Sequence, residues 1–126
     1  MTDFLVSVTV LPFGDGVCSV VCLTGEADLT TTALRDTLTD EVARRPRLIL
    51  VDMSALRFID SGAMQMVVAA YRVFRREGGT LALVRPAPAV ARVLELTGVS
   101  KLVTVYDSVD EAITSACEAR KRDPGH

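Results

Sequence analysis

Several features that mark particular classes of protein are scarce or absent in this sequence. It holds one histidine, His126, at its last position. No apolar run approaches the roughly 20 residues that cross a bilayer. The 14 basic and 16 acidic residues are scattered and leave a net charge of -2, so no basic field is present to hold nucleic acid or an anionic membrane. We therefore expect the partners to be proteins or small molecules.

Two further absences concern location and redox chemistry. The first residues, Met1 to Phe4, lack the basic start and the cleavage site of a signal peptide, so we expect a cytosolic protein. Cys18, Cys22 and Cys117 are odd in number and sit in apolar segments, where a free cysteine behaves as a small hydrophobic residue. We expect buried thiols.

The length and composition of the chain suit one globular domain. The chain has 126 residues, of which 49% are hydrophobic, which is enough for a single core and too little for two domains. We expect one domain over residues 1–118, followed by a flexible tail over residues 119–126.

The pattern of apolar residues predicts an alternation of strands and helices. Runs rich in Val, Leu and Ile predict strands at Phe4–Leu11, Val17–Thr24, Leu48–Val51, Thr80–Val84 and Leu102–Tyr106. Apolar spacings of three and four predict helices between Asp28 and Pro46, from Ser61 to Gly78, from Pro88 to Gly98, and from the capping box at Ser108 onward. This order predicts an α/β fold, with a mixed, mostly parallel sheet of about five strands, an antiparallel edge hairpin and about four covering helices.

Functional sites in open α/β sheets gather beyond the carboxyl ends of the strands. That rule selects the segment Gly25–Asp28 after the second strand and the segment Asp52–Ser61 after the third. Asp28, Asp52 and Asp60 could converge there on Mg²⁺, although scattered aspartates are more often turn and cap residues. No glycine-rich phosphate loop is present. We therefore predict neither a metal ion nor a cofactor.

Ser61 begins the second helix, where unpaired N–H groups and the helix dipole favour negative charge. A phosphate at this position would add about -1.5 to -2 charge and would act on binding rather than on the fold. The alternative is that Ser61 or Asp60 simply caps the helix. Ser61 is a poor candidate for a catalytic nucleophile, because that role needs a nearby base and the single histidine is His126. We expect no enzymatic activity.

Three stretches of the chain match a known family pattern. They are Gly25-Glu26-Ala27-Asp28, Leu50-Val51-Asp52-Met53-Ser54 and Phe58-Ile59-Asp60-Ser61-Gly62. On these motifs, residues 4–117 resemble the STAS domains, named for sulfate transporters and anti-sigma factor antagonists, and especially the small bacterial anti-anti-sigma factors.

The resemblance implies a partner-switching function. In the family, the serine after the aspartate is phosphorylated by an anti-sigma factor that is also a serine kinase, which makes Ser61 the expected phosphoacceptor. The unphosphorylated chain would bind this kinase and release a sigma factor, phosphorylation would block binding, and a serine phosphatase would restore it. The chain would be a monomer or a weak homodimer. The expected partner-binding residues are Gly25, Glu26, Asp28, Asp60, Ser61, Gly62 and Gln65.

The chain departs from the family pattern directly after the acceptor. Members usually carry a second Ser or Thr and then Gly, whereas this chain has Gly62 and Ala63. Gly62 removes a side chain from the contact surface, so partner choice is left open. The alternative function is a constitutive STAS subunit of a signalling or lipid-transport complex, in which Ser61 is a cap and is never phosphorylated.

Overall fold

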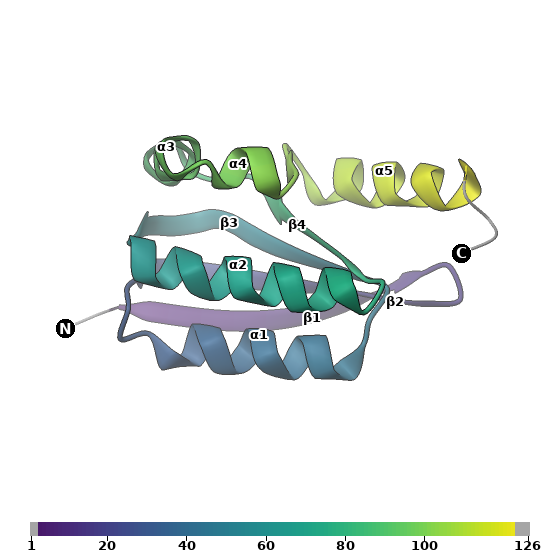
Figure 1. Cartoon of the computed structure of the whole chain (residues 1–126), viewed down its shortest axis with the longest axis horizontal. Helices are drawn as coiled ribbons and strands as arrows, with labels where there is room; N and C mark the ends of the chain where they lie inside the picture. Colours follow the sequence, from purple (N-terminus) through teal and green to yellow (C-terminus); the bar gives the residue numbers. More distant parts are fainter. Residues whose placement is uncertain (1–2, 123–126) are drawn as a thin grey trace.

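A five-stranded mixed sheet in the order β1-β2-β3-β4-β5 lies at the centre of the computed structural model, which describes residues 3–122 (Figure 1). β1 and β2 pair antiparallel, and the remaining neighbours pair parallel. This arrangement confirms the predicted fold class. The strands are β1 Phe4–Phe13, β2 Gly16–Ala27, β3 Leu48–Ile59, β4 Thr80–Val84 and β5 Val105–Tyr106.

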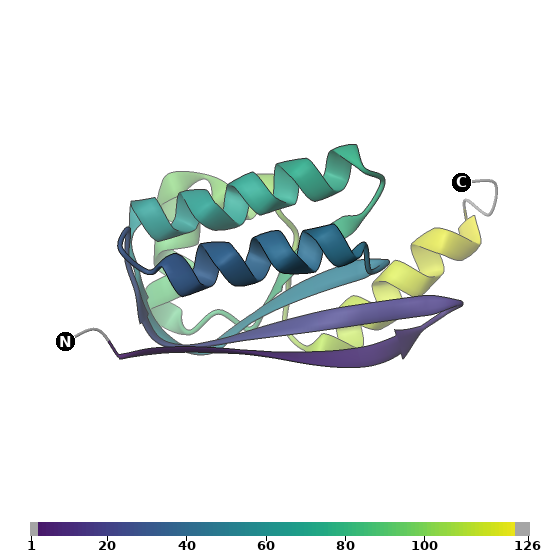
Figure 2. The same cartoon turned by 90° about the horizontal axis from the view of Figure 1, so that it is seen from below.

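Helices cover both faces of the sheet. They are α1 Thr32–Arg44, α2 Ser61–Arg76, α3 Pro88–Thr97, α4 Val99–Leu102 and α5 Val109–Arg122. The buried side chains of α1, α2 and α3 share one core with strand residues such as Ile49, and Figure 2 shows α1 and α2 alongside each other across the sheet. Ala112 of α5 packs on the other face, against a second cluster that contains Leu50. None of the helices described over residues 3–122 is long and apolar enough to span a membrane.

The third strand is much longer than the sequence predicts. We expected a strand over Leu48–Val51 and a loop from Asp52, but β3 continues to Ile59 because β2 stays paired with it up to Ala27. The pairing with β4 ends at Asp52, so the second half of β3 is paired on one side only. Two register shifts in the β2–β3 pairing break the two-residue alternation. That interruption explains why the pattern suggested a loop.

The carboxyl-terminal third contains smaller departures. The strand predicted at Leu102–Tyr106 is reduced to the two residues of β5, and the single turn of α4 precedes it. The predicted cap at Ser108 is confirmed, because its Oγ accepts a hydrogen bond of 3.0 Å from the Glu111 N–H. α5 continues to Arg122, so residues 119–122 are helical where we expected a tail. Residues 123–126 lie outside the described part of the chain, and a tail there stays a prediction.

The three cysteines differ in burial. Cys18 is fully buried, as predicted, and burial raises the pKa of its thiol to about 11. Cys22 and Cys117 are half-buried, so the prediction of buried thiols holds fully only for Cys18. Burial, reinforced by the charge of Asp52, also raises the pKa of Cys22, although a hydrogen bond from Ser7 acts in the opposite direction.

Gly25, near the end of β2, has a backbone conformation that favours glycine. Its φ is +96°, and a Cβ atom there would overlap the carbonyl oxygen of Asp3. That oxygen accepts a 3.0 Å hydrogen bond from the Glu26 N–H. The absence of a side chain at Gly25 therefore allows the Asp3 backbone to pack against the end of β2. Gly25 is itself buried, which does not fit the exposed partner contact that the resemblance implied.

We predict that Gly25→Ala destabilises the domain more than Gly78→Ala. Both glycines have positive φ, but a Cβ at Gly78 meets no atom within 4 Å. The left-handed backbone should cost each alanine variant about 1–2 kcal/mol, and Gly25→Ala must also displace the Asp3 backbone. Urea unfolding should show a loss of about 2–3 kcal/mol for Gly25→Ala and about 1 kcal/mol for Gly78→Ala. Equal losses would contradict this assignment.

Candidate functional site

The side chain of Asp60 joins the start of α2 to the loop that follows β2. Its Oδ1 accepts a hydrogen bond of 2.8 Å from the Ala63 N–H and so caps the helix. Its Oδ2 accepts a hydrogen bond of 3.1 Å from the Leu29 N–H, and its own N–H donates to the Ala27 carbonyl at 3.1 Å. Of the two capping alternatives that the sequence left open, the structure selects Asp60.

Ser61 is the first residue of α2, and its side chain is exposed. The structure gives its hydroxyl no hydrogen bond to any residue between 3 and 122. The first turn of α2 contains no acidic side chain, and the positive end of the helix dipole lies at this terminus. An accessible hydroxyl with no structural task therefore lies at the carboxyl end of β3.

Asp28 holds its own loop together. Its Oδ1 accepts hydrogen bonds from the Thr30 N–H at 2.8 Å and the Thr30 hydroxyl at 2.6 Å, with a longer one of 3.3 Å from the Thr31 hydroxyl. In return, Thr31 Oγ1 accepts a bond of 2.9 Å from the Asp28 N–H. The bonds from Thr30 stabilise the ionised form and lower the pKa of the Asp28 carboxyl. Asp28 therefore orders residues 28–31.

Leu29 lies directly against Gly62. A Cβ atom added at Gly62 would be 2.7 Å from Leu29 Cδ1, 2.8 Å from its Cβ and 3.2 Å from its Cα. These distances are too short for van der Waals contact, so Leu29 occupies the space in which a residue 62 side chain would begin. The Leu29 side chain is nevertheless 68% exposed. The sequence reasoning missed this residue, whose only signal is an isolated leucine between Asp28 and a run of threonines.

Most of the predicted site residues gather at one edge of the sheet. Asp28, Asp60, Ser61 and Gly62 are connected through Leu29 by the contacts above. The segment of β2 that holds Gly25 and Glu26 leads into this loop, and Glu26 pairs with Phe58 on β3. Gln65 is exposed and lies one helical turn after Ser61. Phe58, which the sequence reasoning did not select, is 49% exposed beside this edge.

Asp52 does not belong to this cluster. It pairs with Cys22 on β2 and with Val84 on β4, whereas Ala27 marks the end of β2 beside Asp60. The five residue steps from Cys22 to Ala27 correspond to roughly 16 Å of strand. Among the residues that the structure describes, no three His, Cys, Asp or Glu side chains are grouped to hold a metal ion. The Mg²⁺ alternative therefore lacks a ligand set there.

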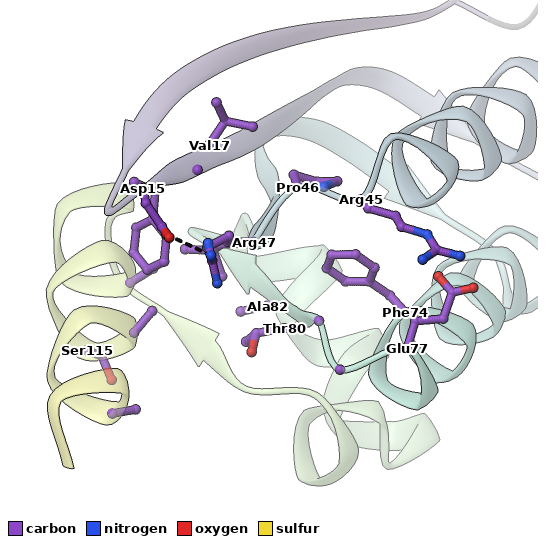
Figure 3. Close-up of a pocket in the computed structure, with 18 of the residues that line it drawn as sticks. Asp15, Val17, Arg45, Pro46, Arg47, Phe74, Glu77, Thr80, Ala82 and Ser115 are labelled. Atoms are coloured by element: carbon purple, nitrogen blue, oxygen red, sulfur yellow. Dashed lines mark ion pairs between the residues drawn. The ribbon is translucent and has the colours of Figure 1, made fainter. Parts of the chain in front are cut away.

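A separate cavity of about 660 Å³ lies at the opposite end of the sheet, where β3 and β4 begin (Figure 3). It lies between α5, the β1–β2 turn and the end of α2. Arg47 and Asp15 form an ion pair of 2.7 Å within it, and the lining carries Arg45 and Glu77 as well. The opposite charges balance, so the cavity shows no preference for a ligand of one sign.

The chain is similar to proteins of one family, and the family model of the STAS domain matches residues 11–112. An anti-sigma F factor antagonist from Paenibacillus polymyxa is 29% identical over 97 residues, which cover 75% of this chain and 83% of that protein.

Two solved structures are also similar to the chain. The crystal structure of an anti-sigma factor antagonist from Mycobacterium paratuberculosis is 32% identical with a TM-score of 0.75, and the match covers 89% of this chain and 94% of that one. The phosphorylated form of the Bacillus cell fate determinant SpoIIAA shares the fold at 20% identity and a TM-score of 0.63, covering 86% of this chain and 98% of that one.

We predict that Asp60→Ala destabilises the domain and releases the loop at Leu29. The variant loses a helix cap, worth about 0.5–2 kcal/mol, together with the bond to the Leu29 N–H, worth about 0.5–1.5 kcal/mol. Ser108→Ala is the matched control, because it removes only the cap of α5. Urea unfolding should show the larger loss for Asp60→Ala, and hydrogen exchange at the Leu29 amide should accelerate in that variant alone. If the hydrogen-exchange rate of the Leu29 amide is unchanged in Asp60→Ala, the Asp60 side chain does not hold this loop.

We also predict that Asp28 titrates below the ordinary pKa of aspartate, about 3.9. The pKa of Asp28 is lower in the folded state than in the unfolded chain. Its hydrogen bonds from Thr30 therefore stabilise the folded loop at pH values above the unfolded-state pKa, and this stabilisation is lost as the pH falls through the folded-state pKa. The carboxyl ¹³C shift of Asp28, followed by NMR, should report a higher midpoint in Thr30→Val, which removes the hydroxyl donor. Thr37→Val on α1 should leave the midpoint unchanged. The same midpoint in Thr30→Val and wild type would rule out the hydroxyl as a cause.

Proposed function

The chain belongs to the STAS domain family, and from this we propose that it is an anti-sigma factor antagonist switched by phosphorylation of Ser61. The observation that carries the proposal is the exposed Ser61 hydroxyl at the start of α2, which forms no hydrogen bond with any residue that the structure describes. The similar proteins from Paenibacillus polymyxa and Mycobacterium paratuberculosis are named anti-sigma factor antagonists, which supports the same class of function for this chain.

The proposed partner is an anti-sigma factor with serine kinase activity. The unphosphorylated chain binds it and thereby frees a sigma factor. In the transfer step, Ser61 Oγ forms a bond to the γ-phosphorus of ATP while the bond from that phosphorus to the β,γ-bridging oxygen breaks. ADP leaves, and the hydroxyl proton passes to a base on the kinase. A serine phosphatase then hydrolyses the phosphoserine and restores binding.

The phosphate should act on binding more than on folding. At the N-terminus of α2 the helix dipole favours the added charge by about 0.3–1 kcal/mol, while the neighbouring Asp60 carboxylate opposes it. Asp60 keeps its backbone donors at Ala63 and Leu29, so the loop remains attached. At an interface, a charge and desolvation penalty of about 3 kcal/mol would weaken binding by roughly a hundredfold.

We propose that the docking surface surrounds Ser61. It consists of the end of β2, the loop that Asp28 orders, and the first turns of α2. Gln65 lies on the same side of α2 as Ser61, because residues four apart are neighbours on a helix, and it is exposed. The proposed surface residues are Glu26, Asp28, Asp60, Ser61, Gly62 and Gln65, whereas Gly25, which the resemblance also implied, is buried.

The alternative function, a constitutive STAS subunit, treats the serine as a structural cap. Asp60 caps α2 instead, so the Ser61 hydroxyl has no capping task that would explain its presence. This observation favours the switch over the constitutive subunit.

We predict that a kinase-type anti-sigma factor and ATP will phosphorylate the chain at Ser61. Tandem mass spectrometry of the reaction should locate the phosphate there. Ser61→Ala should remain unmodified, and Ser54→Ala should be modified like wild type, because Ser54 is exposed on β3 away from the start of α2. Phosphate on another residue, or no phosphate with any such kinase, would refute the switch.

Binding measurements test the consequence of this modification. Isothermal titration should show that Ser61→Ala binds the kinase about as well as wild type, while Ser61→Glu binds up to roughly a hundredfold more weakly. Ser54→Glu places the same charge outside the proposed surface and should bind like wild type. Equal affinities for Ser61→Ala and Ser61→Glu would show that this position does not control binding.

A further inference from the structure

An exposed leucine lies next to the proposed phosphoacceptor. Leu29 follows Asp28 in the loop after β2, and its side chain lies over Gly62, the residue directly after Ser61. Single exposed apolar residues are common on protein surfaces and need no special explanation. Leu29 differs from an ordinary surface leucine because separate features of the site hold it in place.

The first feature is the glycine at position 62. A Cβ atom there would approach not only the end of the Leu29 side chain but also its Cα, at 3.2 Å. Rotation of the leucine side chain would therefore not make room for a larger residue, and the loop backbone would have to shift. Leu29 can occupy its observed position only because residue 62 has no side chain.

The second feature is the bonded loop. The Leu29 N–H donates to Asp60 Oδ2, and the neighbouring Thr30 and Thr31 N–H groups donate to the side chain and the carbonyl of Asp28. The backbone that carries Leu29 is fixed on both sides. Because the loop is already ordered, it loses little conformational entropy when a partner contacts this side chain, and this favours tight binding.

We propose that Leu29, seated on Gly62, is the apolar contact that selects the kinase partner, and that this partner presents an apolar depression beside the site that receives Ser61. The inference rests on the proposed function and deepens it. Because Gly62 has no side chain and Leu29 is 68% exposed, an apolar group lies directly beside the acceptor, among the polar side chains of Asp28, Asp60 and Gln65. A chain with Ser or Thr at position 62 would present a hydroxyl there instead. A kinase surface that offers hydrogen-bond partners to such a hydroxyl would leave them unpaired against Leu29.

The test compares Leu29→Ala with Leu96→Ala in binding to the kinase-type anti-sigma factor that binds wild type. Leu96 is the matched control, because it is 76% exposed on α3. We expect Leu29→Ala to weaken binding about tenfold and to raise the KM of the phosphorylation of Ser61 with little change in kcat. Leu29→Met should retain most of the affinity, because methionine fills a similar apolar volume. Leu96→Ala should bind like wild type.

Gly62 supplies a second, independent measurement. Gly62→Ala should weaken binding because it displaces Leu29, and the double variant Leu29→Ala with Gly62→Ala should lose less than the product of the two single losses. Thermal unfolding of each variant, with its circular dichroism spectrum, confirms that the comparison is made between folded proteins.

The possible failures can be told apart. If wild type binds and is phosphorylated while Leu29→Ala has the same affinity and KM, the Leu29 contact is refuted and the Ser61 switch stands. Fully multiplicative losses in the double variant would refute the coupling between Leu29 and Gly62. If wild type binds no kinase-type anti-sigma factor and receives no phosphate, the proposed function fails and this inference fails with it.

Discussion

The carboxylate of Asp60 is the interaction on which the arrangement of the site depends. One oxygen accepts from the N–H of Ala63 in the first turn of α2, and the other accepts from the N–H of Leu29 in a loop that precedes it by 31 residues. Hydrogen bonds from N–H groups to an ionised acceptor are stronger than those between neutral groups. A single side chain thus fixes the helix start and places the neighbouring loop beside it, while the Ser61 hydroxyl is left to face solvent.

The sheet brings these two segments close enough for Asp60 to join them. β2 and β3 remain parallel neighbours to their last residues, and Ala27 pairs with Ile59. Their carboxyl ends therefore lie at the same edge. The register shifts in this pairing occur after the point at which β4 stops accompanying β3. Buried Met53, Leu56 and Ile59 still anchor the extension in the core, so it provides a rigid base for the exposed residues beyond it.

The sequence was sufficient for most of the elements and for the general position of the candidate site, because these follow from local patterns. The 3.6-residue period of α2, the Ser108 cap and the apolar run that begins β3 were all visible in it. It was insufficient where one segment's conformation depends on another. The extension of β3 depends on its pairing with β2, and a pattern of single residues does not report a register shift. Leu29 was missed for the same reason, because its contact with Gly62, 33 residues away, is not visible in the sequence around it.

The departure of Gly62 from the family pattern has a structural explanation once Leu29 is considered. Taken alone, a glycine in the first turn of a helix costs up to about 1 kcal/mol relative to alanine, which would be an unexplained weakness beside the site. In this chain an alanine side chain would collide with Leu29 Cβ and Cα, so the usual preference for alanine should be reduced or reversed. Leu29 and Ser61 are exposed and lie outside both core clusters, so exchanging them should cost little stability. On the proposal that Leu29 selects the partner, a different partner could be accommodated at little cost in stability, provided that residues 29 and 62 change together.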